Sequence, residues 1–364
     1  MTRNFLTVLC LIGLVATPGS FQERVKETQS ALFEINVDDK TGFIDRTGVI
    51  VIPPQFMASG YGTHFSEGLA PVYIKGQWCY INQKGSIVTR TKFDRVGPFS
   101  EGLARVGSNT HKLENGIKYG YIDRSGKVVI EPQFDETYGF SEGLGRVVID
   151  GKWGFIDTTG RMVIPPQFLG AYWFSEGLAS VALDADIRVY IDHTGRVVSD
   201  PQYEYTDAWF SDGLAPAKKG SRWGFVTKDW KFAIEPQYEY VAQRFSDGLA
   251  AVRLDGKYGF IDLAGKMVIE PRYDGPLIFS EGLAAFRVGG KYGYINKKGE
   301  TVIEPQFSRA EDFRSGLAAV TSDETVNYLQ CGCWDKWDYI DKTGRYIWRH
   351  NKVTPASVTS SPGR

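Results

Sequence analysis

The chain has 364 residues and a formal net charge of −1 at pH 7, with 42 basic and 43 acidic residues interspersed along it. This balance excludes the basic footprint of a nucleic-acid-binding protein. After the N-terminus, no stretch is long and apolar enough to be expected to cross a membrane as a helix.

The first predicted element is a secretory signal peptide over residues 1–20. Arg3 precedes an apolar run from Phe5 to Val15, and small residues follow it. Cleavage after Ala16 or after Gly19 fits the pattern equally well. We therefore expect an exported protein, periplasmic or extracellular, in which residues 21–30 form a linker to the folded part.

From about residue 31 to residue 350, one short pattern of residues recurs. Its most regular part is Phe-Ser-Glu/Asp-Gly, whose glycines stand 34 to 36 residues apart except for one step of 41. These glycines are Gly68, Gly102, Gly143, Gly177, Gly213, Gly248, Gly282 and Gly316. A fixed period indicates a repeat array of about nine units with degraded ends, rather than separate domains. The Ser/Pro/Gly-rich tail, 351–364, is expected to be disordered.

Each unit is predicted to be a three-stranded antiparallel meander. Gly-Leu-Ala-x-Val forms the first strand, and a pair such as Asp150-Gly151 marks a tight hairpin turn after it. Trp/Tyr-Gly-Phe/Tyr-Ile-Asp forms the second strand, and Val-Ile-x-Pro-Gln-Phe forms the third. A proline there removes a hydrogen-bond donor, so the third strand is expected to end pairing at that point and to blunt an edge.

The alternation of residues predicts how these strands pack. Gly154 lacks a side chain on an apolar face, which indicates close approach by another chain segment. The x position of Gly-Leu-Ala-x-Val varies freely and is expected to be exposed; it holds Pro71, Arg105, Ser180 and Ala251. We expect an all-β, open, solenoid-like superhelix, with a closed β-propeller as the alternative.

The Trp-Gly and Tyr-Gly dipeptides give the chain a resemblance to WG-repeat proteins. They stand at Trp153-Gly154, Trp223-Gly224, Tyr119-Gly120, Tyr258-Gly259 and Tyr292-Gly293, with Phe-Ser-Glu-Gly-Leu-Ala segments between them. The fifth unit departs from the pattern, with Arg188-Val189 in place of the dipeptide. The resemblance implies a bacterial, mostly β repeat protein with no established enzymatic activity and a role in recognition or assembly.

An acidic residue precedes most of the regularly spaced glycines. Stacking of the units would align these residues into a row that could attract a cation or a basic partner, although turn chemistry alone explains acidic residues here. The row comprises Glu67, Glu101, Glu142, Glu176, Asp212, Asp247 and Glu281, and Ser315 breaks the series.

The aromatic residues fall into two groups. Those of the Trp-Gly and Tyr-Gly dipeptides are expected to be buried between units, because both flanking faces are apolar. Trp173, Trp209 and Trp230 lie outside the dipeptide position, so they are the better candidates for a binding surface.

The remaining motifs give no catalytic, cofactor or metal site. Cys331 and Cys333 stand too close together for an easy mutual disulfide, and a link from either to Cys79 would require the array nearly to close, so free thiols are expected. The histidines occupy different repeat positions, and neither a zinc-protease motif nor a phosphate loop is present.

The leading functional hypothesis is therefore an exported, non-enzymatic scaffold for a protein or a cell-envelope polymer. The alternative is a lectin-like, carbohydrate-binding module that uses surface aromatic residues. An enzyme would have to depend on the two non-repeat insertions, 107–115 and 321–335.

Overall fold

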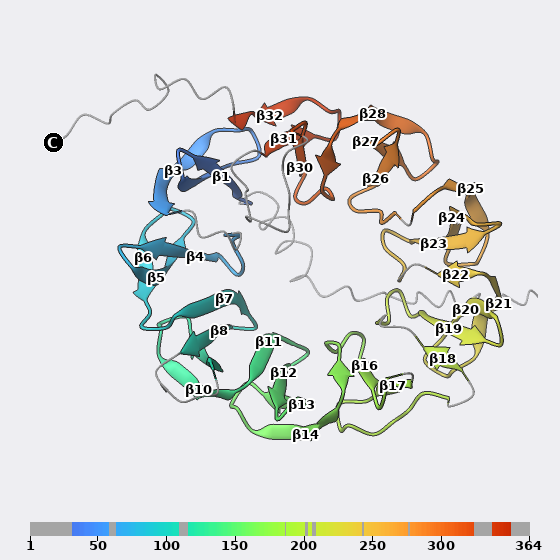
Figure 1. The fold of residues 1–364 in the computed structure, drawn as a ribbon, viewed down its shortest axis with the longest axis horizontal. Helices are drawn as coiled ribbons and strands as arrows, with labels where there is room; N and C mark the ends of the chain where they lie inside the picture. The colour runs from blue at the N-terminus through green and yellow to red at the C-terminus, as the bar shows by residue number, and fades with distance from the viewer. Residues whose placement is uncertain are drawn as a thin grey trace, which may run out of the picture.

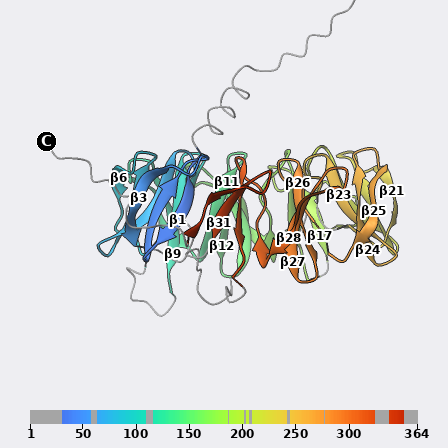
Figure 2. The ribbon, with the colours of Figure 1, turned by 90° about the horizontal axis from the view of Figure 1, so that it is seen from above.

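The computed structural model describes residues 31–57, 63–108, 116–185, 187–200, 203–205, 209–241, 244–275, 277–323 and 337–350. The predicted signal peptide, most of both insertions, Cys331, Cys333 and the tail lie outside these ranges. The described residues form 32 β-strands, which confirms the all-β prediction. The strands are arranged as a ring around a central opening (Figure 1), and the ring is flat when seen from its edge (Figure 2).

The strands fall into eight sheets arranged around the ring, and the first sheet contains two consecutive meanders. In the sheet order, the edge strands opposite the outer ones, called the inner strands below, are β7 (Arg95–Ser100), β11 (Glu136–Ser141), β15 (Gly170–Ala171), β18 (Glu204–Tyr205), β22 (Tyr240–Val241) and β29 (Arg309–Ala310). The Gly-Leu-Ala-x-Val strands are β1 (Phe33–Val37), β4 (Leu69–Ile74), β8 (Leu103–Ser108), β12 (Leu144–Ile149), β16 (Ala179–Ala182), β19 (Ala215–Lys219), β23 (Leu249–Leu254), β26 (Leu283–Val288) and β30 (Leu317–Thr321).

The remaining strands complete each sheet toward the rim. The Trp/Tyr-Gly strands and their equivalents are β2 (Lys40–Ile44), β5 (Gln77–Asn82), β9 (Lys118–Asp123), β13 (Lys152–Asp157), β17 (Arg188–Ile191), β20 (Arg222–Val226), β24 (Lys257–Asp262), β27 (Lys291–Asn296) and β31 (Asp338–Asp341). The outer strands are β3 (Ile50–Met57), β6 (Ile87–Arg90), β10 (Val128–Phe134), β14 (Met162–Phe168), β21 (Phe232–Tyr238), β25 (Met267–Tyr273), β28 (Thr301–Phe307) and β32 (Tyr346–Trp348).

The ring closes, so the alternative prediction, a β-propeller, is correct and the open superhelix is wrong. The first and last units meet through the same kind of contact that joins internal neighbours. A Cβ on Gly48 would lie 2.4 Å from the carbonyl oxygen of Ile347, just as one on Gly160 would lie 3.1 Å from the side chain of Ile130. The Tyr339 hydroxyl also donates a 2.8 Å hydrogen bond to the carbonyl oxygen of Glu34. Closure follows because every junction repeats one geometry and the rotations add up to a full circle.

Most sheets also contain a strand that the sequence analysis missed. The segment before Gly-Leu-Ala-x-Val, expected to be a connection, forms the inner strand, as in the order β11-β12-β13-β14; this strand includes Phe-Ser in β7 and β11 and ends before Phe-Ser in the other sheets. This inner strand is short or irregular. In β11 the pairing register shifts between Thr137 and Phe140. A four-stranded sheet is the usual unit of a propeller.

The predicted turns and the close approach at the glycine of the dipeptide are confirmed. Asp150 and Gly151 both have positive φ, 50° and 72°, as a two-residue hairpin turn of this kind requires. A Cβ on Gly154 would lie 2.6 Å from the carbonyl oxygen of Ile164 and 2.8 Å from the nitrogen of Pro166. The proline-containing bulge of β14 therefore passes directly over β13, and only glycine fits beneath it.

Both faces of each sheet are covered by the neighbouring sheets, and the core lies between them. One such layer contains Phe155 and Ile164 of one sheet with Phe174 and Val181 of the next. Ser180 and Ala251, at the x position that was expected to be exposed, are 0% and 5% exposed. That expectation is wrong because it treated the meander as having one face in water.

Candidate functional site

The acidic row lies in the turns that connect the inner strand to the Gly-Leu-Ala-x-Val strand. Glu142 and Gly143 have φ of 53° and 79°, so they are the central residues of a tight hairpin turn. The serine before each acidic residue donates to the next sheet; Ser141 Oγ lies 2.8 Å from the carbonyl oxygen of Phe174. The acidic side chain also bonds to the next sheet, as an acceptor: Glu142 Oε2 accepts a 3.0 Å hydrogen bond from the Gly177 nitrogen.

This hydrogen bond from a glycine nitrogen to an acidic side chain of the preceding sheet recurs around the ring. The carboxylates of Glu67, Glu101, Glu176, Asp247 and Glu281 accept from the backbone nitrogens of Gly102, Gly143, Gly213, Gly282 and Gly316, respectively. Three row members also form ion pairs with the sheet that follows, through Arg124, Lys228 and Lys342, and Glu142 Oε2 lies 3.1 Å from Nε2 of His193. The row therefore contributes to inter-sheet contacts, as its turn chemistry suggested.

The row does not assemble a cation site among the described residues. No group of three or more His, Cys, Asp or Glu side chains in those ranges could hold a metal ion. Asp212 differs from the rest of the row, since its carboxylate accepts no hydrogen bond from another described residue. Cys79 is buried, is not in a disulfide, and has a thiol pKa raised by burial.

Trp230 does not lie with the other two candidate tryptophans. It takes the place of the glycine in the Asp-x-x-Gly turn after β20, with a φ of 61°. Its ring packs 5.6 Å from Tyr190 and 5.7 Å from Phe210, at the edge of a core cluster. The side chain thus fills a junction between sheets.

Trp173 and Trp209 come together from neighbouring sheets. Each precedes the buried phenylalanine of a Phe-Ser segment, and both side chains are half-buried. Their ring centroids lie 4.4 Å apart. Tyr172 lies beside them, with its ring centroid 6.2 Å from that of Trp209.

Arginines flank this tryptophan pair on both sides. The guanidinium carbon of Arg244 lies 4.1 Å from the centroid of Trp209, and that of Arg146 lies 5.2 Å from Trp173. Arg146 also lies 4.5 Å from Tyr138 and 5.6 Å from Trp153, whose rings stack on each other. We call this set the arginine–aromatic patch; it comprises Arg105, Tyr138, Arg146, Trp153, Trp173, Trp209 and Arg244.

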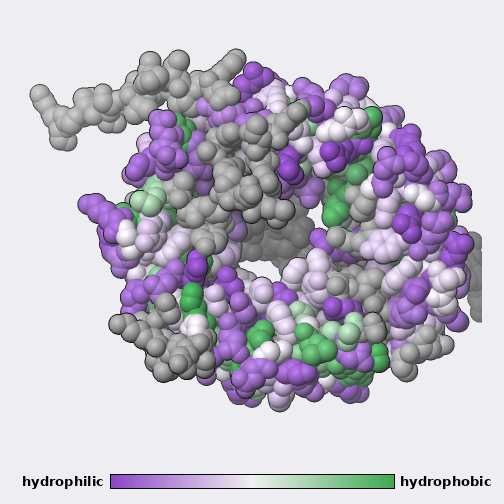
Figure 3. All heavy atoms as spheres, viewed as in Figure 1, coloured by the Kyte–Doolittle hydropathy of each residue, from purple (hydrophilic) through white to green (hydrophobic). Residues whose placement is uncertain are grey.

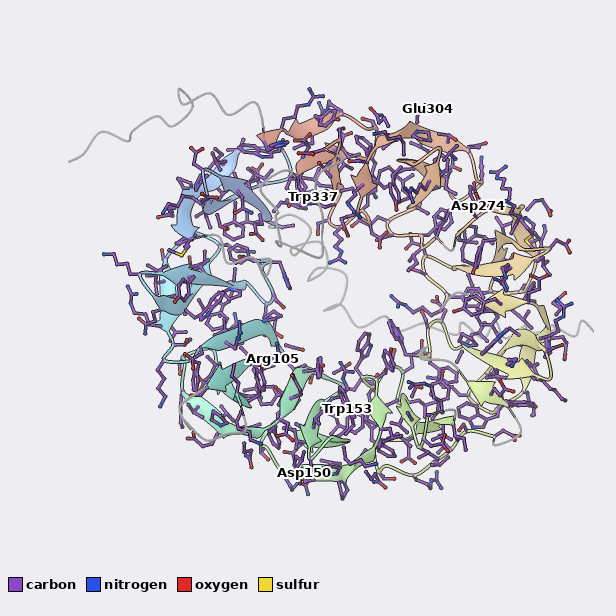
Figure 4. All side chains as sticks on the ribbon, in the orientation of Figure 1. Arg105, Asp150, Trp153, Asp274, Glu304 and Trp337 are labelled. Carbon is purple, nitrogen blue, oxygen red and sulfur yellow. The ribbon has the colours of Figure 1, made fainter. Side chains whose placement is uncertain are left out.

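The patch extends over several sheets on the side of the inner strands. Arg105 and Trp153 project from adjacent sheets in Figure 4, and Arg105 lies 5.9 Å from the ring of Tyr138. Tyr138 is 37% exposed. In the space-filling view, the β11–β17 arc shows both polar and apolar side chains (Figure 3). The patch is therefore in contact with solvent.

The electrostatics of Arg146 set it apart from the other arginines. Only 9% of the residue is exposed, Nη1 donates a 2.7 Å hydrogen bond to the carbonyl oxygen of Ala171, and Nε is buried with no hydrogen-bond partner. Burial lowers the pKa of Arg146, and the groups that oppose this effect are tyrosines rather than carboxylates. Burial also lowers the pKa of Arg244. Buried charges without a counter-charge are costly.

The sequence analysis missed these arginines. Arg105 and Arg146 occupy the x position, which it took to be exposed and therefore uninformative. The available signal was that two consecutive units place arginine where most others place a small residue or proline. The aromatics of the dipeptides, such as Trp153 and Trp223, are half-buried rather than fully buried, whereas Tyr258 is 8% exposed.

A hollow lies beside the first sheet. Its volume is about 550 Å³, and Tyr73, Trp78, Phe93 and Arg95 are among its lining residues. The Trp78 indole nitrogen already donates to the carbonyl oxygen of Asp94 at 3.2 Å.

One solved structure, an initiation factor, supports the fold. A eukaryotic initiation factor shares 12% identity with a TM-score of 0.56, covering 87% of this chain and 94% of its own. BamB from Moraxella catarrhalis shares 13% identity with a TM-score of 0.40, covering 74% and 92% of the two chains. AztD from Citrobacter koseri shares 12% identity with a TM-score of 0.41, covering 74% and 90%. No curated protein matches the sequence, and the described residues contain no helix long and apolar enough to cross a membrane.

The sequence family described as WG containing repeat matches eight tandem segments: 42–78, 79–109, 119–153, 153–184, 190–223, 223–258, 258–292 and 292–324. Most of these segments start in the Trp/Tyr-Gly strand of one sheet and end in the equivalent strand of the next, so each sequence repeat bridges two sheets. Because the segments cover most of the residues and account for the junctions between sheets, this chain belongs to the WG-repeat family.

Proposed function

We propose that this protein is an exported, non-enzymatic scaffold that binds a protein partner through the arginine–aromatic patch. The observation that carries the proposal is the composition of the patch. Tryptophan, tyrosine and arginine dominate the energetic centres of protein interfaces. Here they gather mostly at positions that the repeat does not require, with Trp153 of the dipeptide as the exception, whereas the side chains of the acidic row mostly bond to the neighbouring sheet of the ring.

Site-specific photo-crosslinking in the source cells tests this proposal. A photo-reactive residue at Tyr138 is expected to give a discrete crosslinked partner. The matched control is Tyr240, which is 38% exposed against 37% for Tyr138 and lies in β22. Equal crosslinking from both positions, or none from Tyr138, would contradict the location of the binding surface.

Carbohydrate binding is the second candidate, favoured by the half-buried pair of Trp173 and Trp209. A glycan panel read by tryptophan fluorescence separates the two functions. A saturable shift that is lost in Trp209→Leu would favour the lectin-like function, whereas a silent panel with a specific protein crosslink would favour the scaffold.

Export depends on residues 1–20. Deletion of this segment is expected to leave the protein in the cytoplasm, and N-terminal sequencing of the exported protein is expected to begin after Ala16 or Gly19. Retention of the full N-terminus in the mature protein would contradict this part of the proposal.

A further inference from the structure

The charge of the arginine–aromatic patch is not balanced within the part of the chain that the structure describes. Elsewhere on the ring, several arginines pair with carboxylates, as Arg161 does with Asp157 at 2.9 Å and Arg253 with Glu239 at 3.3 Å. Within the patch, Arg105 reaches Glu136 at 3.8 Å. For Arg146 and Arg244, no described carboxylate lies within ion-pairing distance.

The two guanidinium groups are held in fixed positions. Arg146 packs against Tyr138, Trp153 and Trp173, while Arg244 packs over Trp209, so the aromatic planes restrict their rotation. The two tryptophans between them are 4.4 Å apart, which makes one continuous surface across four sheets. Such preorganisation reduces the conformational entropy lost when a ligand binds.

A carboxylate is the group that this arrangement fits. A guanidinium presents planar N–H donors that match a carboxylate with two parallel bonds, and these bonds are strong where water is excluded. The buried Nε of Arg146 has no hydrogen-bond partner among the described residues, so the fold satisfies this guanidinium only in part. Half-buried aromatic faces beside the donors accept the backbone and aliphatic parts of an extended chain.

We propose that the arginine–aromatic patch binds an acidic peptide segment of the protein partner, with carboxylates of the segment pairing with Arg146 and Arg244. This inference rests on the proposed scaffold function. The binding is expected to weaken with added salt, because part of the surface is open to solvent.

The test uses the mature chain from residue 21 and a labelled synthetic peptide of alternating glutamate and glycine, read by fluorescence anisotropy. The same peptide with glutamine in place of glutamate is the charge control, and polygalacturonate is the carboxylate polymer without a peptide backbone. Arg244→Gln and Arg146→Met are expected to weaken glutamate-peptide binding by at least tenfold.

Arg287→Gln is the matched protein control. Arg287 is exposed and lies 5.6 Å from the ring of Tyr292, within a sheet that does not contribute to the patch. Its substitution removes the same charge. It is expected to change binding by less than twofold. Unchanged melting temperatures would show that the variants remain folded.

Three results would overturn the inference: equal binding of the glutamate and glutamine peptides, equal effects of Arg244→Gln and Arg287→Gln, or tighter binding of polygalacturonate than of the glutamate peptide. The crosslink from position 138 distinguishes a failure of the acidic-peptide inference from a failure of the scaffold function. If the crosslink weakens in Trp209→Leu but persists in Arg244→Gln, the scaffold function stands and the acidic-peptide inference fails. If neither variant changes the crosslink, the acidic-peptide inference fails, and if position 138 gives no discrete crosslink, both fail.

Discussion

Two units place a charged side chain at the same position of the same strand, with opposite consequences. Glu34 in β1 and Arg146 in β12 both lie opposite the aromatic residue that follows the dipeptide glycine, Phe43 and Phe155, respectively. The Glu34 carboxylate accepts hydrogen bonds from the Thr63 nitrogen and, at 3.4 Å, from Asn36. Arg146 has no carboxylate partner among the described residues and leaves Nε unused.

The comparison shows what the x position does in a closed ring. Because both faces of every sheet are covered, a charge there is taken largely out of water and needs partners. At Glu34 the fold supplies partners beside the junction that closes the ring. At Arg146 aromatic rings and one carbonyl supply only part of what a guanidinium requires, which is why we assign the remainder to a ligand.

The largest expected effect comes from substituting the glycine beneath the outer strand, a feature that both units share. A Cβ on Gly42 would lie 2.6 Å from the nitrogen of Pro54, and one on Gly154 would lie 2.6 Å from the carbonyl oxygen of Ile164. Alanine at either position is expected to lower the free energy of unfolding by about 3 kcal/mol or more, because the contacts are with backbone atoms that cannot move aside. Denaturant unfolding measures the change.

Gly151→Ala is the control for this prediction. Gly151 has a positive φ, but a Cβ added there would have no neighbouring atom within 4 Å, so only backbone strain of about 1 kcal/mol is expected. Equal losses at Gly151 and Gly154 would mean that the close approach of the outer strand is not what requires glycine.

These glycines also illustrate what sequence reasoning reached. The hairpin turns and the crowding at Gly154 follow from residue types alone, since positive φ and a missing side chain each have a local cause. Closure does not, because curvature depends on small rotations at each junction. The short inner strand was obscured by its irregular pairing near Thr137. Arg146 was missed because its burial depends on the neighbouring sheet.

The second prediction concerns Glu34. Burial raises the pKa of its carboxyl from the usual 4.5 to about 7. Between about pH 4.5 and pH 7, the folded state therefore holds a proton that the unfolded state has released. The contribution of neutral Glu34 to the free energy of unfolding is fully present below about pH 4.5 and is lost as the pH rises through 7. One pKa unit corresponds to about 1.4 kcal/mol. Since Glu34 keeps some contact with water, we expect a loss of about 2 kcal/mol.

Glu34→Gln isolates this contribution, because glutamine keeps an acceptor oxygen but does not titrate. Between pH 5.5 and pH 8.5, the wild-type protein is expected to lose about 2 kcal/mol more unfolding free energy than the variant. Parallel stability profiles for the two proteins would show that Glu34 is not protonated in the folded state at pH 5.5.

A smaller effect is expected in the acidic row. Glu142→Gln removes the carboxylate that lies 3.1 Å from His193 Nε2 and weakens the bond from the Gly177 nitrogen. Because these groups are largely exposed, the expected loss is about 0.5–1 kcal/mol. Asp212→Asn serves as the comparison, since no such bond from Asp212 is found among the described residues, and it is expected to be neutral. A loss of glutamate-peptide binding in Glu142→Gln would show that the row belongs to the binding surface.

The smallest expected change in stability is at Arg146. Methionine there would lose the hydrogen bond to the Ala171 carbonyl and the contacts with three rings, but it would also remove a buried guanidinium that has no counter-charge. These effects nearly cancel, so Arg146→Met is expected to change the unfolding free energy by less than about 1 kcal/mol while abolishing peptide binding. A loss of about 3 kcal/mol or more would instead make Arg146 a structural residue like Glu34, because removing a well-satisfied buried polar group is strongly destabilising.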